Sequence, residues 1–198
     1  MTHTLFDKIG NRKYLVARER FSFASAAFAE GGDVGAFCLT LAFTGARISE
    51  LLALTPERID RAGGVIVLET LKQRKRGRFR AIPVPARLFA VLERVLGVAA
   101  PSRDPRERLW KWGRTTAWKR VKTVMRTAKI REALATPRAV RHAFGVEAVQ
   151  SGVALNVLQR WMGHARIETT AIYADVTGKE ERALARRTWK RLQKALKY

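Results

Sequence analysis

The stretch PRAVRHAFG, residues 137–145, brings two arginines and a histidine, Arg138, Arg141 and His142, to the start of a predicted helix. Thr136 is a good N-cap and the proline after it suits the first helical position, so both arginines fall within the first two turns, on one face. Free backbone N–H groups and guanidinium forks at a helix N-terminus bind phosphate. On these residues alone, a phosphate site and a solvated basic helix end are equally good interpretations.

The charge of the chain favours the phosphate interpretation. Its 198 residues include 39 Lys plus Arg against 17 Asp plus Glu, which gives a formal net charge of +22. A charge of this size implies a polyanionic partner, and nucleic acid is the first candidate. A protein that coats DNA or RNA without specificity would have the same composition.

The rest of the composition limits the fold and the compartment. With 47% apolar residues, a chain of this length can form one domain with its own core. Its single cysteine, Cys38, lies in an apolar run, so we expect a buried thiol and a cytoplasmic location. The sequence has no apolar run of ~18 residues and no metal-ligand spacing, so we expect no membrane association and no metal.

Helical periodicity dominates the elements that must position these side chains. Apolar residues recur at helical spacing in residues 14–30, 34–54, 85–96, 115–130, 138–152, 154–164 and the tail after 172. Two β-branched runs around a basic turn within residues 63–84 predict a β-hairpin. We therefore predict an α+β fold that is mostly α, with one small antiparallel sheet. Residues 1–12 have no pattern and are expected to form a flexible leader.

Four motifs follow one another along the chain. They are TGARISELLAL at 44–54, LKQRKRGRFRAIPV at 71–84, RAVRH at 138–142 and WMGHARIETTAIYAD at 161–175. In this order they resemble the tyrosine recombinase (phage integrase) family over about residues 13–185. The resemblance implies the catalytic-domain fold of that family for residues 13–198, with a C-terminal helix at about 179–198. It also implies a site-specific recombinase or integrase.

The resemblance assigns chemistry to individual residues. Tyr173 would attack a phosphate of double-stranded DNA, forming a 3′-phosphotyrosyl link and releasing a 5′-hydroxyl. Because that link stores the energy of the broken bond, no cofactor, ATP or metal is implied. Arg47 and Arg141 would stabilise charge on the non-bridging oxygens. Glu50, three residues after Arg47 on the same predicted helical face, would either orient an arginine or form an ordinary surface ion pair.

The basic turn of the predicted hairpin supplies a general acid in the family. By resemblance we choose Lys72, which directly follows the first strand, to protonate the departing 5′-oxygen. A lysine pKa is easily lowered in a cationic site, whereas that of an arginine is not. The other cations of the turn are predicted to contact the DNA backbone: Arg74, Lys75, Arg76 and Arg78.

One position departs from the family pattern His-x-x-Arg-His. This chain has Arg138 at the first histidine, and an arginine donates to a phosphate but cannot accept the proton of the tyrosine. The acceptor of the tyrosine proton is therefore left open between a water, the phosphate itself and His164. His164 is also the predicted donor to the phosphate. His142 is either a packing residue or a catalytic one.

Residues 110–126 predict a DNA-contacting helix after a turn at Gly113. Trp118, Val121 and Met125 recur at helical spacing and are assigned to the core. Contacts to phosphates position a protein on DNA without selecting a sequence. The residues predicted to make the DNA contacts are Arg114, Thr115, Thr116, Lys119, Arg120 and Lys122.

The family resemblance also raises expectations about assembly. Family members usually carry an N-terminal core-binding domain, which we do not find before the first matching helix, so we expect an excised catalytic fragment or a natural minimal enzyme. The C-terminal helix would dock on a neighbour in a synaptic tetramer or pack on its own domain, and an accessory DNA-binding protein would add affinity. Two further alternatives are a type IB topoisomerase-like enzyme and a non-catalytic DNA-binding regulator. Arg138 supports the regulator.

Overall fold

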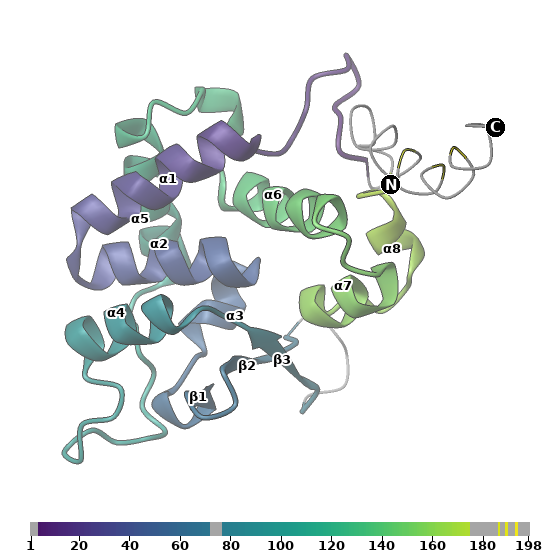
Figure 1. Ribbon diagram of the computed structural model, residues 1–198. Coiled ribbons are helices and arrows are strands. Elements are labelled where there is room, and N and C mark those ends of the chain that lie inside the picture. The colour runs from purple at the N-terminus through teal and green to yellow at the C-terminus, as the bar shows by residue number, and fades with distance from the viewer. Residues whose placement is uncertain (1–3, 72–76, 175–185, 187–188, 190–192, 194–198) are drawn as a thin grey trace.

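The computed structural model describes residues 4–71 and 77–174, together with residues 186, 189 and 193. Most of the described chain is helical, and one small sheet lies beside the helices (Figure 1). Four cations of the hairpin turn lie outside the described residues: Lys72, Arg74, Lys75 and Arg76. Most of the predicted C-terminal helix lies outside them as well.

Helix α2 (Gly32–Thr44) runs through the middle of the helical body. It is apolar on nearly every side, as expected for a helix enclosed by others. Cys38 is fully buried there, as predicted, and burial raises the pKa of its thiol to about 12. The longer helices that contact α2 are α1 (Ala17–Glu30), α4 (Ala86–Leu96), α5 (Arg114–Thr127) and α6 (Pro137–Gln150).

The chain breaks its helical path between α2 and the short helix α3 (Ile48–Leu52). The continuous helix predicted over residues 34–54 is therefore wrong. Helix α2 ends at Thr44, Gly45 has a φ of 59°, and Arg47 is extended. A glycine accepts this left-handed conformation without a Cβ clash and so ends the helix. The break makes Arg47 the N-cap of a new helix instead of a residue inside a long one.

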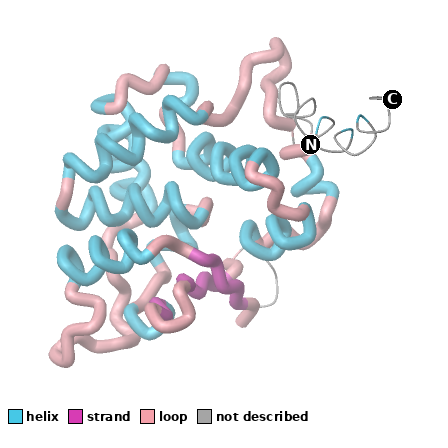
Figure 2. Tube along the Cα trace, in the orientation of Figure 1, coloured by secondary structure: helices cyan, strands magenta, loops and turns pink. Residues whose placement is uncertain are grey.

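The sheet has three antiparallel strands in the order β1-β2-β3 and is magenta in Figure 2. The strands are β1 (Ile59–Asp60), β2 (Val65–Glu69) and β3 (Phe79–Pro83). Ile66 pairs with Ile82 and Leu68 pairs with Arg80, and all four side chains lie on the buried face. The predicted hairpin is confirmed. The two-residue strand β1 was missed because so short a segment has no alternation to detect.

Short helices complete the described chain beside its N-terminal segment (Figure 1). They are α7 (Leu155–Met162) and α8 (Glu168–Ala171), and single 3-10 turns lie at Pro56–Arg58 and Glu132–Leu134. Leu5 is 2% exposed, and with Tyr14 it belongs to a second hydrophobic cluster completed by Val146, Ala148, Leu158, Met162 and Tyr173. The packing of Leu5 was not predicted, because its partners are distant in the chain and local sequence gives no sign of them. The flexible leader expected for residues 1–12 stays a prediction.

Candidate active site

Arg141 lies on α6 and links three parts of the fold. The predicted N-cap of this helix is present, since Thr136 Oγ1 accepts a hydrogen bond from Ala139 N at 3.1 Å. Arg141 is 8% exposed and donates through Nη1 to the Gly45 carbonyl at 2.7 Å and through Nη2 to the Met162 carbonyl at 2.6 Å. Burial and the charge of Arg47 lower the pKa of Arg141. The Gly45 break and the end of α7 thus fix this guanidinium.

Glu50 is a buried carboxylate shared by two arginines. It is 1% exposed and accepts hydrogen bonds from Arg47 Nη1 at 2.7 Å and from Arg80 Nη2 at 2.6 Å. Its Oε2 also accepts from the Arg47 backbone N–H at 2.8 Å, which caps α3. Burial alone would raise the pKa of this carboxyl, but the charges of Arg80 and Arg47 hold it below its ordinary value. The surface ion pair considered from the sequence is therefore wrong.

Arg80 is a buried residue of the arginine cluster that the sequence analysis missed. Besides its ion pair with Glu50, it donates through Nε to the Trp161 carbonyl at 2.7 Å and through Nη1 to Thr70 Oγ1 at 2.9 Å. It therefore joins the sheet to α3 and α7. The alternation of strand β3 could have revealed it, because Arg80 and Ile82 share one face.

His164 follows the end of α7, where Gly163 caps the helix. Its Nε2 lies 3.1 Å from Arg141 Nη2, and its Nδ1 lies 2.9 Å from Thr170 Oγ1. Because a guanidinium only donates, Nε2 accepts and Nδ1 carries the hydrogen. Burial and the charge of Arg141 lower the pKa of His164 to about 3. In this arrangement the ring is neutral and both nitrogens are engaged, so the predicted donor has no free N–H for a phosphate.

Tyr173 packs against α6 with its hydroxyl directed at a histidine. Its side chain is 2% exposed, and its hydroxyl lies 3.1 Å from His142 Nδ1. The ring is nearly parallel to that of His164, at 7° and 6.4 Å between centroids. A Cβ added to Gly145 would come within 2.6 Å of the tyrosine ring. Burial raises the pKa of Tyr173 to about 12, although the charges of Arg141 and Arg47 oppose it.

Two groups of side chains thus make up the site. The arginine cluster is Arg47, Glu50, Arg80 and Arg141. The tyrosine group is Tyr173 with the two histidines that contact its hydroxyl and ring, His142 and His164. Arg138 was predicted on the same face as Arg141, but it is exposed, and no hydrogen bond or ion pair among the described residues ties it to either group.

The predicted DNA-contacting helix exists as α5, with two differences from expectation. Val121 and Met125 are buried, as predicted, but Trp118 is 38% exposed, so its assignment to the core is wrong. The second difference concerns two of the predicted DNA contacts, which have partners within the chain: Arg120 lies over the Trp112 ring, and Lys122 has an ion pair with Glu132. The other predicted contacts on α5 are exposed and have no ring or ion-pair partner among the described residues: Arg114, Thr115, Thr116 and Lys119. Arg78, on the hairpin, is also exposed.

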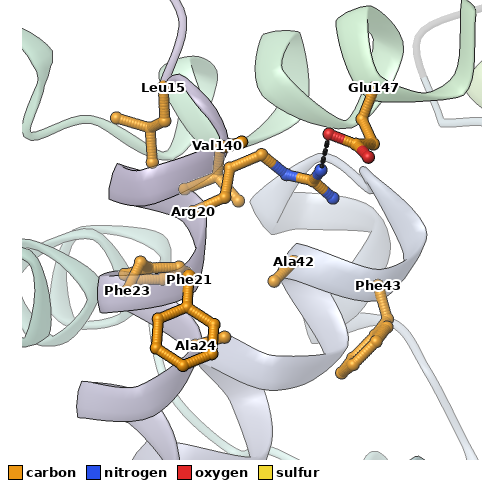
Figure 3. A pocket seen from close by; sticks show the side chains of 10 residues that line it. Leu15, Arg20, Phe21, Phe23, Ala24, Ala42, Phe43, Val140 and Glu147 are labelled. Carbon is orange, nitrogen blue, oxygen red and sulfur yellow. Dashed lines mark ion pairs between the residues drawn. The ribbon is translucent and has the colours of Figure 1, made fainter. Parts of the chain in front are cut away.

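A pocket between α1, α2 and α6 shares no residue with either group (Figure 3). Apolar side chains line it, including Phe21 and Phe43, and Arg20 Nη1 pairs with Glu147 Oε2 at 2.6 Å. Within residues 4–71 and 77–174, no group of three or more His, Cys, Asp or Glu could hold a metal ion. No helix in the described chain is long and apolar enough to cross a membrane.

The fold and the site define a mostly helical domain that surrounds buried arginines and an adjacent tyrosine. The family model described as the phage integrase family matches residues 28–180. Because this match covers most of the sequence, the chain belongs to the phage integrase family.

Individual relatives agree with this assignment. The tyrosine recombinase XerA of Pyrococcus furiosus is 31% identical over 147 residues, which cover 71% of this chain and 49% of XerA. The post-cleavage complex of XerH recombinase with its palindromic difH substrate matches with a TM-score of 0.73 at 19% identity, covering 88% of this chain and 52% of XerH. The catalytic domain of bacteriophage HP1 integrase matches with a TM-score of 0.62 at 23% identity, covering 87% and 93%. These structures confirm the predicted fold, and the chain spans about half the length of the curated relatives it matches.

Proposed function

We propose that this chain is the catalytic domain of a site-specific recombinase or integrase that cleaves and rejoins DNA strands through Tyr173. The observation that carries the proposal is the chain of contacts from Arg141 to His164 and on to the Tyr173 ring. A phosphate-binding guanidinium and a nucleophilic hydroxyl thereby belong to one site. The names of the relatives, tyrosine recombinases and a DNA complex after cleavage, support it.

The proposed reaction needs no external energy source. The Tyr173 oxygen bonds to the phosphorus, and the bond from phosphorus to the 5′-oxygen breaks. The resulting 3′-phosphotyrosyl link retains the energy of the phosphodiester. A 5′-hydroxyl of another strand then attacks the same phosphorus and releases the tyrosine. We therefore propose no cofactor.

The arginine cluster would bind the phosphate that reacts. Arg141 uses three of the five N–H donors of a guanidinium on Gly45, Met162 and His164, so two remain. The Arg47 side chain is 26% exposed, whereas Glu50 and Arg80 below it are enclosed, so Arg47 can reach a ligand. Preorganised donors of this kind stabilise the charge that develops on the transition state.

The remaining predicted residues complete the proposal. Lys72 would protonate the departing 5′-oxygen, and Arg138, exposed near the start of α6, would donate to a phosphate. The other cations of the hairpin turn and the exposed polar residues of α5 would grip the DNA backbone. Binding through so many cations should weaken steeply as salt rises.

Assembly and location follow from the family resemblance and the charge. We propose double-stranded DNA as the partner, because a net charge of +22 needs a polyanion. Self-association into a synaptic tetramer, an accessory DNA-binding protein and a cytoplasmic location are the further parts of this proposal.

The test is formation of a covalent protein–DNA adduct. Nicked, end-labelled duplexes that tile the DNA flanking the gene are incubated with the chain and separated on a denaturing gel. We expect a labelled band at the protein's size, which is lost in Tyr173→Phe. Adducts from no duplex would argue for a DNA-binding regulator, and relaxation of plasmid without recombinants would argue for a topoisomerase.

A further inference from the structure

The Tyr173 hydroxyl must lose its proton before or as it attacks, and one described residue forms a hydrogen bond with it. His142 Nδ1 lies 3.1 Å from the hydroxyl, within reach for proton transfer. No other hydrogen bond of this hydroxyl occurs within the described part of the chain. The phenol is hard to ionise unaided, since burial raises its pKa to about 12.

The other candidate bases near the tyrosine within residues 4–71 and 77–174 are already engaged. His164 accepts from Arg141 through Nε2 and directs Nδ1–H at Thr170, so neither nitrogen has a lone pair free for the phenol. The Glu50 carboxylate is bonded to two arginines. Arg138 stands where the family pattern has a histidine, and a guanidinium cannot take the proton.

Helix α6 carries His142 and packs against the ring of Tyr173, so it positions both partners of the 3.1 Å contact. His142 is half-buried, and its ring lies 6.0 Å from that of Tyr173, inclined at 52°. Three residues further along, Gly145 leaves the space that the tyrosine ring fills. The packing of the ring therefore directs the hydroxyl at Nδ1.

We propose that His142 is the general base of strand cleavage, accepting the Tyr173 proton through Nδ1. This deepens the proposed function and rests on it. As the tyrosine oxygen bonds to phosphorus, its proton moves to Nδ1, and the bond to the 5′-oxygen breaks; that oxygen takes a proton from the general acid, Lys72. On rejoining, the imidazolium returns its proton to the tyrosine oxygen while the 5′-hydroxyl attacks. The neutral resting ring must therefore carry its hydrogen on Nε2.

The first test examines the resting tautomer in the free chain. The whole chain is labelled with ¹⁵N-histidine, and the signals are assigned with His142→Asn and His164→Asn, at a pH where His142 is neutral. We expect an unprotonated Nδ1 in His142 and a protonated Nδ1 in His164. A hydrogen on Nδ1 of His142 would overturn the proposal, because the ring would then donate to the phenol. This test needs no DNA, so it is decided even if no duplex is cleaved.

The second test separates proton transfer from simple positioning. His142→Asn keeps a polar atom near Nδ1 but accepts no proton, and we expect adduct formation to slow about 100- to 10,000-fold. Gln150→Asn, on the exposed end of the same helix, is the matched control and should cleave normally. The variant is then remade with 3,5-difluorotyrosine at position 173, whose phenol is more acidic. We expect this to recover most of the loss.

The outcomes distinguish this inference from the proposed function. If His142→Asn cleaves at the normal rate, His142 has no role in cleavage. If the variant is slow but the acidic phenol recovers nothing, His142 only positions the ring. Either result overturns the proposal, and the proton then goes to a water or to the phosphate. If the unaltered chain forms no adduct at all, the proposed function fails and the general-base role fails with it. The tautomer of His142 still shows whether the Tyr173 hydroxyl donates its hydrogen bond to Nδ1.

Discussion

The two groups of the site are held by very different supports. The arginine cluster is fixed by backbone carbonyls at the ends of α2 and α7, by a buried carboxylate and by strand β3. Tyr173 instead follows α8, a helix of four residues, and its hydroxyl contacts only a histidine among the described residues. The arginine cluster is therefore preformed, whereas Tyr173, the proposed nucleophile, rests on fewer polar contacts, and its part of the site should open more easily.

Removal of Glu50 should cause the largest loss on the arginine side. Glu50→Ala leaves Arg47 and Arg80 without their shared carboxylate in a buried site. Breaking a buried ion pair in this way costs about 3–5 kcal/mol. Urea unfolding should show this loss together with loss of cleavage. A loss below about 1 kcal/mol would mean that the cluster is not preformed.

Arg47→Ala should affect the chemistry more than the fold, because its side chain reaches the surface. Loss of one preorganised donor slows a reaction by about 100- to 1000-fold. Single-turnover adduct formation measures this effect, and a gel-shift assay should show DNA affinity largely retained. An equal loss of affinity and of rate would assign Arg47 to binding alone.

Gly145→Ala tests the tyrosine group without altering a polar residue. The new methyl would meet the Tyr173 ring, so the ring must leave its place on α6 and with it the contact to His142. Overpacking of this kind costs about 1–3 kcal/mol where the structure cannot relax. If the Tyr173 ring leaves α6 easily, the measured loss of unfolding free energy should be smaller than this range. The NMR signals of the tyrosine ring should shift at the same time. An unchanged spectrum would contradict the packing described.

Acid should weaken the arginine cluster less than substitution does, since a protonated Glu50 still hydrogen-bonds. The pKa of Glu50 is lower in the folded chain than its ordinary value of 4.5. Its contribution to stability is therefore complete above pH 4.5 and is lost as pH falls through the folded pKa. The difference in unfolding free energy between the unaltered chain and Glu50→Gln should shrink as pH falls below 4.5. A constant difference would argue against a charged, paired Glu50.

The smallest effect is expected outside both groups. The Arg20–Glu147 pair at the pocket of Figure 3 has side chains 28% and 41% exposed. Exposed pairs contribute about 0–1 kcal/mol. Arg20→Ala should therefore change neither the melting temperature nor adduct formation appreciably. A large loss of cleavage would mean that the pocket belongs to the site.

The parts of the site that sequence could predict are those that lie in the ordered family motifs. The resemblance singles out Arg141 and Tyr173, and in the structure both lie beside His164. The fold class followed from periodicity, which records which side of each element is buried. Thr136 as the N-cap of α6 is local chemistry of the same kind.

The parts that sequence could not predict depend on contacts between distant segments. Arg138 and Arg141 are three residues apart on one helix, yet only Arg141 is buried, because the carbonyls of Gly45 and Met162 meet it. Nothing local distinguishes the two. For Arg80 the alternation of strand β3 could have indicated a buried position, but not its partners, which come from α3 and α7.

The central claim is that the hydroxyl of Tyr173 forms the bond to DNA, and peptide mass spectrometry tests it most directly. The gel-purified adduct is digested with nuclease and protease, and the modified peptide is sequenced by fragmentation. We predict a nucleotide phosphate on Tyr173 and on no other residue. A nucleotide on Tyr14, on Tyr198 or on a serine would contradict the account.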